Sequence, residues 1–144
     1  MTILVGYRPK PAARRALAEA ATMARERNRP LHILRYLEHE AGESPKQVRH
    51  EAGESSAVQA ELAQLREEFE RDGIEVIVQV VHGLRGGAGR ALLDVARSID
   101  AELIVLGASK RSTFEEIVLG SVVREVLAGA GCPVLTVKAD EDGS

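Results

Sequence analysis

The sequence predicts an α/β fold, an open doubly wound sheet of five parallel strands. Short, nearly continuous apolar runs alternate with segments of helical period, which is typical of strands buried on both faces. Alanine-rich helical stretches and β-branched runs favour α/β over all-β. Strands that are joined by helices must run parallel, with right-handed crossovers. Hydrophobic residues make up 44% of the chain but aromatic residues only 3%, so the core must be built from Val, Leu, Ile and Ala.

Local sequence features predict where individual helices begin and end. Pro11 suits the first turn of a helix whose alanines and Leu17 form a narrow apolar stripe. Gly73 is predicted to end the second helix as its C-cap. We expect nine elements in this order: strand 2–7, helix 11–28, strand 30–37, helix 56–73, strand 74–81, helix 89–100, strand 101–107, helix 120–131 and strand 132–139.

The length of 144 residues fits one domain, predicted over 1–139, with a flexible acidic tail at 140–144. The polar stretch 38–55, in which HEAGES occurs twice, is predicted to be a mobile surface loop. Ser55 would then cap the following helix. The His-Glu steps invite a metal site, but the histidines lie eleven residues apart with Pro45 between them, so we expect no bound metal.

Composition excludes several classes of protein. The net charge is −3, with 19 basic and 22 acidic residues interspersed, which argues against a nucleic-acid-binding surface. No apolar run approaches the roughly 18 to 20 residues of a spanning helix, and no basic region precedes the first apolar residues. We therefore expect a cytoplasmic protein that does not enter a membrane. The single cysteine, Cys132, excludes an internal disulfide.

From ILVGY to CPVLTVK the chain resembles the universal stress protein family. Its closing third, DAELIVLGASKRSTFEEIVLGSVVREVLAGAGCPVLTVK, follows the family's pattern of strand, glycine loop, Gly-Ser, helix, Cys-Pro-Val and last strand. The resemblance implies a Rossmann-like sheet of the adenine nucleotide alpha hydrolase type, with strand order 3-2-1-4-5. In such sheets ligands bind beyond the carboxyl ends of the strands, where the winding reverses, here between strands one and four.

ATP-binding members of that family carry Gly, two residues, Gly, nine residues, and then Gly followed by Ser or Thr. Gly107 matches the first glycine and Gly120 with Ser121 matches the last pair, with the spacing intact. Lys110 stands where the second glycine is expected. Glycine permits positive φ and a close approach of N–H groups to an anion. A lysine would cost about 1 kcal/mol if positive φ is required, and its side chain would border the phosphate site.

Two further departures concern other loops. Arg8 occupies the position of an aspartate that helps ATP-binding relatives to hold the nucleoside, and Pro9 and Lys10 replace a Gly-Ser pair. After the third strand, LRGGAGRA is longer and richer in glycine than the resemblance implies. This segment is either an anion-binding turn or, as we favour, a loose connection.

Cations are therefore expected to gather at the crevice, and three interpretations remain open. They are solvated, or Lys110 binds phosphate as a point charge, or Glu115 and Glu116 pair with them and close the site. The four cations are Arg8, Lys10, Lys110 and Arg111.

The resemblance implies a small dimeric stress-response or regulatory module. In one version it binds ATP, with Mg²⁺, or another adenine nucleotide through Gly107, Lys110, Gly120, Ser121 and Arg8. In the other it has lost nucleotide affinity and acts through protein contacts, and a less favoured alternative is an enzyme for a small anionic substrate. No catalytic residues are readable, because none of the four histidines has a nearby nucleophile pattern. We expect at most slow, incidental ATP hydrolysis.

The last predicted strand should lie at a sheet edge, where Val134, Leu135 and Val137 would be exposed. Universal stress proteins typically dimerise by antiparallel pairing through this strand. We therefore expect a homodimer; the alternative is an edge covered by its own chain.

Overall fold

A computed structural model describes residues 1–40, 45–110 and 119–140, with the backbone alone for 45–52, 110 and 140. Strands and helices alternate along the chain. They are β1 (Thr2–Gly6), α1 (Pro11–Arg27), β2 (Leu31–His39), α2 (Pro45–Arg71), β3 (Val76–Leu84), α3 (Ala88–Ser98), β4 (Ala101–Lys110), α4 (Ser121–Gly129) and β5 (Val134–Asp140).

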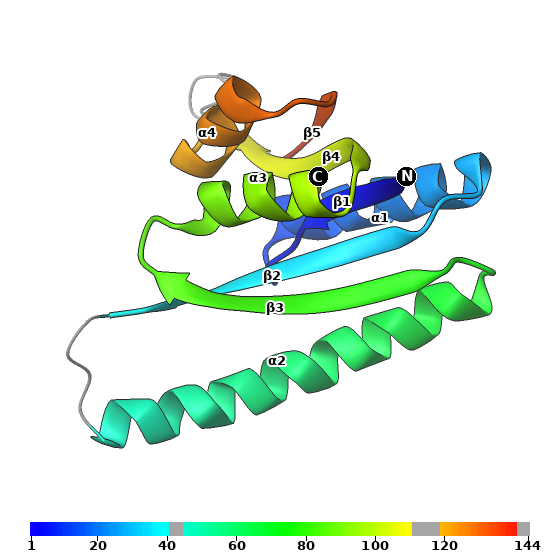
Figure 1. Cartoon of the computed structure of the whole chain (residues 1–144). Coiled ribbons are helices and arrows are strands. Elements are labelled where there is room, and N and C mark those ends of the chain that lie inside the picture. Colours follow the sequence, from blue (N-terminus) through cyan, green and yellow to red (C-terminus); the bar gives the residue numbers. More distant parts are fainter. Residues whose placement is uncertain (41–44, 111–118, 141–144) are drawn as a thin grey trace.

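The five strands form one sheet in the order β3-β2-β1-β4-β5, and every neighbouring pair is parallel (Figure 1). Val5 in β1 lies opposite Ile33 of β2 on one side and Val105 of β4 on the other. The predicted α/β fold and strand order are confirmed. The winding reverses at β1, so the carboxyl ends of β1 and β4 border the crevice that such a sheet offers to a ligand.

Two apolar cores cover the two faces of the sheet. Ile3 and Val5 point to the face that α1 and α2 cover, and Leu62 of α2 is 1% exposed there. Leu4, between them in sequence, points to the face covered by α3 and α4. Strand residues on both faces are apolar because both faces are covered. The described residues include no helix long and apolar enough to cross a membrane.

The prediction of a long polar loop at 38–55 is wrong. β2 continues to His39, and α2 begins at Pro45 and runs for 27 residues beside β3 (Figure 1). Pro45 fits the first position of a helix, and most of the next ten residues are good helix formers, so the single Gly53 does not interrupt the helix. Ser55 lies inside α2, so the expected cap at that residue is wrong as well.

The predicted end of the same helix is confirmed. Gly73 has a φ of +81°, and its N–H donates to the carbonyl of Glu70 at 3.0 Å. This left-handed residue satisfies a terminal carbonyl of α2 before the chain enters β3. β4 continues three residues beyond its predicted end at Gly107, so Lys110 is a strand residue opposite Asp140 of β5.

Candidate functional site

A cavity of about 800 Å³ lies at the carboxyl ends of β1, β2 and β4. Its lining includes the chain after β1, the end of β2, the glycine-containing end of β4 and the first turn of α4. The volume is in the range of small-molecule sites. The cavity therefore occupies the crevice that the strand order predicts.

One side of the cavity is formed by Gly107 and by the beginning of α4. Gly120, with φ −68° and ψ 167°, is the N-cap of α4, and Ser121 is its first residue. Both are exposed and both line the cavity. The N-cap glycine has no side chain with which to cap this helix end, and the first N–H groups of a helix have no partner within the helix. An anion in the cavity can accept hydrogen bonds from them.

Gly107 has a packing role that the sequence pattern did not reveal. A Cβ at this position would lie 2.5 Å from the carbonyl carbon of Ala12 and 2.7 Å from the nitrogen of Ala13. Both atoms belong to the backbone of α1, which therefore crosses β4 at very short range. This glycine is required for the contact between α1 and β4, whatever the cavity binds.

Lys110 is described through its backbone alone. As a residue paired in a parallel ladder it has an extended backbone, so the positive φ that would strain a lysine is not required there. Three other residues named for this loop, Arg111, Glu115 and Glu116, lie outside the described residues. The structure thus brings together four of the five predicted site residues: Arg8, Gly107, Gly120 and Ser121 line one cavity.

Part of the cavity lining is cationic. Arg8 and Lys10 line it after β1, as the sequence led us to expect, and Arg35 lines it from β2. Within the described part of the chain none of the three forms an ion pair, although Glu38 and Glu54 also line the cavity. Unpaired guanidinium and ammonium groups beside a cavity favour an anionic ligand.

Arg35 was missed by sequence reasoning. Its Nη1 donates to the carbonyl oxygen of Tyr36 at 3.1 Å, and its Nε is buried with no hydrogen-bond partner among the described residues. The only signal in the sequence was a charged residue within the apolar run PLHILRYL. A buried donor without a partner costs free energy unless a ligand or water accepts its hydrogen bond.

Tyr36 occupies the space that side chains would need at two glycines, one at the end of β3 and one just after it. Its hydroxyl donates to the carbonyl of Leu84 at 2.6 Å, and a Cβ at Gly83 or Gly87 would overlap that hydroxyl. Gly86 has a φ of +87°. The connection from β3 to α3 is thus a turn packed against Tyr36, which itself lines the cavity, and not the loose connection we expected.

Two histidines meet at the ends of β2 and β3. The rings of His39 and His82 are stacked with centroids 4.8 Å apart, and His39 Nε2 lies 2.6 Å from His82 Nδ1. One nitrogen must donate and the other accept, so a hydrogen bond joins the two rings. Among the described residues no three His, Cys, Asp or Glu side chains are placed to hold a metal ion.

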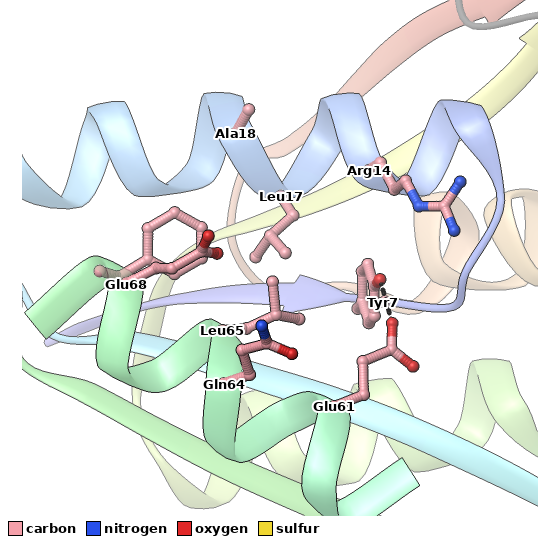
Figure 2. A pocket seen from close by; sticks show the side chains of 9 residues that line it. Tyr7, Arg14, Leu17, Ala18, Glu61, Gln64, Leu65 and Glu68 are labelled. Atoms are coloured by element: carbon pink, nitrogen blue, oxygen red, sulfur yellow. Dashed lines mark hydrogen bonds between the residues drawn. The ribbon is translucent and has the colours of Figure 1, made fainter. Parts of the chain in front are cut away.

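A smaller cavity of about 400 Å³ lies between α1 and α2 (Figure 2). Leu17 of α1 and Leu65 of α2 form part of its apolar lining. The Tyr7 hydroxyl donates to Glu61 Oε1 at 2.7 Å, and burial, then this hydrogen bond, raises the pKa of Tyr7, which Arg14 partly opposes. The Tyr7 hydroxyl in this cavity already has Glu61 as its hydrogen-bond partner, so we interpret the cavity as a groove between packed helices. Tyr7 also lines the larger cavity.

Comparison with known proteins agrees with this geometry. The model of the universal stress protein family matches residues 1–138. Universal stress protein MJ0531 of Methanocaldococcus jannaschii is 31% identical over 80 residues, which are 56% of this chain and only 45% of that protein. A universal stress protein structure from Archaeoglobus fulgidus is 29% identical, with a TM-score of 0.72 over 96% of this chain and 98% of the other. A structure from the same organism in complex with dAMP is 27% identical, with a TM-score of 0.66 and the same coverage.

Proposed function

The chain belongs to the universal stress protein family, and from that premise we propose that it is a binding and regulatory module that takes an adenine nucleotide in the larger cavity. The observation that carries the proposal is the beginning of α4, whose N-cap is a glycine and where Gly120 and Ser121 face a cavity that Gly107 also lines. Backbone N–H groups at a helix N-terminus bind phosphate. A relative from Archaeoglobus fulgidus was solved with dAMP, which supports the choice of adenine.

A second candidate function rests on Arg8 and Lys110. These residues replace the aspartate and the second glycine expected of ATP-binding relatives, so the chain has changed at two of the positions that the resemblance assigns to nucleotide binding. In this alternative the module acts through protein contacts without a nucleotide. In neither version do we propose a dedicated enzyme, and any hydrolysis of Mg²⁺-ATP would be slow.

Nucleotide binding is tested by thermal unfolding in the presence of ATP and Mg²⁺. A ligand at 100 times its Kd stabilises the folded state by about 2.7 kcal/mol, which raises the Tm by about 10 °C for a chain of this size. Ser121→Asp should abolish that rise because a carboxylate at the first residue of α4 repels phosphate. The free variant should be no less stable than the parent, since an acid is favourable at this helix end.

Ser56→Asp is the matched control, because Ser56 is exposed on α2 and does not line the cavity. It should keep the full ATP-dependent rise in Tm. A parent protein that shows no rise at millimolar ATP would favour the second candidate function. A rise that survives Ser121→Asp would place the phosphates away from α4.

We also propose that the protein is a homodimer paired through β5. In the described part of the chain β5 has one sheet neighbour, β4, and lies at the edge of the sheet. The N–H of Ile104 donates to the carbonyl of Pro133 at 3.1 Å. In the alternating pattern of a parallel ladder, Thr136 and Lys138 then direct their backbone groups to the outer edge. The Lys138 carbonyl accepts a hydrogen bond there from Arg15 Nη1 at 3.4 Å. An edge strand with unpaired backbone groups favours pairing with a second strand.

Val137→Lys should give monomers in light scattering, because it places a charge on a half-buried strand residue beside the proposed interface. Val80→Lys is the matched control, since Val80 packs against the same core from β3, at the other edge of the sheet. This control should remain dimeric. A Val137→Lys protein that is folded by circular dichroism and still dimeric would refute pairing through β5.

A further inference from the structure

The cationic side of the larger cavity carries an inference that rests on the proposed function. We propose that the preferred ligand is an adenine nucleotide with an additional phosphate on its ribose, at the 2′ or 3′ position, and that Arg8, Lys10 and Arg35 bind this second phosphate. In this proposal the beginning of α4 binds one phosphate group and these three cations bind the other.

The backbone places Arg8 and Arg35 next to each other. Gly6 of β1 pairs with Leu34 of β2, and the N–H of Tyr7 donates to the carbonyl of Leu34 at 2.9 Å. The chain therefore leaves β1 beside Arg35, and Arg8 follows directly. Neighbouring strands are about 4.8 Å apart, a separation from which two long side chains can reach one phosphate group.

These cations have hydrogen-bonding capacity that the fold does not use. The Nε of Arg35 is buried without a partner among the described residues, and Arg8 and Lys10 form no ion pair there. Neither acid that shares the lining is in an ion pair with them among the described residues: Glu38 is within 3.5 Å of the N–H of Gly86, and Glu54 is exposed on α2. A phosphate oxygen is the acceptor that such donors bind best.

The position of the cations specifies where the second phosphate must be. Gly107 on β4 and Arg35 on β2 flank β1, so about two strand spacings, roughly 10 Å, separate the two strands that carry them. In the proposed pose the 5′ phosphates lie at the beginning of α4. A longer chain of 5′ phosphates then leaves the part of the cavity beside Arg35 unoccupied. In doubly wound folds an acid binds the free ribose hydroxyl, whereas an arginine accommodates a phosphate on it.

The test compares the binding of four nucleotides by calorimetry at one salt concentration. Adenosine 3′,5′-bisphosphate and adenosine 2′,5′-bisphosphate are measured against AMP and against ADP, which has the same number of phosphates in a different place. At least one bisphosphate should bind about tenfold or more tightly than ADP, the size expected of one additional charged hydrogen bond. The better of the two identifies the ribose position.

Three variants assign the preference to residues. Arg8→Asp and Arg35→Gln should each lower the affinity for the bisphosphate relative to that for AMP by about tenfold or more. Arg85→Asp makes the same charge change at an exposed residue outside the lining and should leave the preference intact. If ADP binds as well as both bisphosphates, or if Arg8→Asp retains the preference, this inference is wrong while the proposed function stands. If the parent binds none of the four nucleotides, the proposed function fails too.

Discussion

Gly107→Ala should lower the free energy of unfolding by about 3 kcal/mol, at the upper end of the usual cost of overpacking. The new methyl group would lie 2.5 Å from the carbonyl carbon of Ala12 and 2.6 Å from its oxygen. These are backbone atoms, so no side-chain rotation relieves the overlap, and α1 must move away from β4. Denaturation by urea, followed by circular dichroism, measures the loss.

Gly120→Ala is the matched control within the same motif. Among the described residues no atom lies within 4 Å of a Cβ at Gly120, and its φ of −68° is open to any residue. Its free energy of unfolding should change by less than about 1 kcal/mol. Equal losses in the two variants would contradict the packing role of Gly107. The comparison also matters for ligand binding, because a Gly107 variant that fails to bind ATP can fail through its fold alone.

Leu62→Ala should cost about 3 kcal/mol, within the range for truncating a buried leucine. Leu62 is 1% exposed and lies in the core between the sheet and α1. Its neighbours on the same face of α2 include Val58, which is buried, and Leu65 and Phe69, which are half-buried. Loss of Leu62 removes the best buried contact of α2 and leaves a cavity beneath the helix. Thermal and urea unfolding should both report the change.

Leu127→Ala is the matched control. It removes the same atoms from a helical leucine, but Leu127 on α4 is 46% exposed. Its cost should stay below about 1 kcal/mol, because little buried surface is lost. A Leu62→Ala protein as stable as this control would show that α2 is not held by its apolar stripe.

Most of the fold follows from local pattern. Buried strands such as ILV at the start and LIVL before Gly107 are apolar on both faces, and Gly73 ends its helix with the backbone that only glycine adopts readily. The length of α2 could not be predicted from local pattern, because the HEAGES repeat is polar enough for a loop and is also compatible with a helix. Helix propensities differ by less than 1 kcal/mol per residue, so they cannot decide such a case.

The location of the site was predictable, but its chemistry only in part. The strand order alone places a cavity beside Gly107, Gly120 and Ser121. Arg35 and Tyr36 join it because β2 extends past β1, which is a property of the folded sheet and not of a motif. The packing of Gly107 on α1 depends on a crossing between elements far apart in sequence. Contacts of this kind are set by tertiary geometry.

Tyr7 belongs to the walls of both cavities, with its ring buried and its hydroxyl bound to Glu61 on α2. A molecule that displaces this ring from either side changes the free energy of occupying the other side. Such linkage is reciprocal, so the factor by which one occupant alters the affinity for the second is the same in both directions. An occupant of the groove between α1 and α2 and an occupant of the cavity at the ends of the strands would therefore be coupled to the extent that either one moves this aromatic side chain.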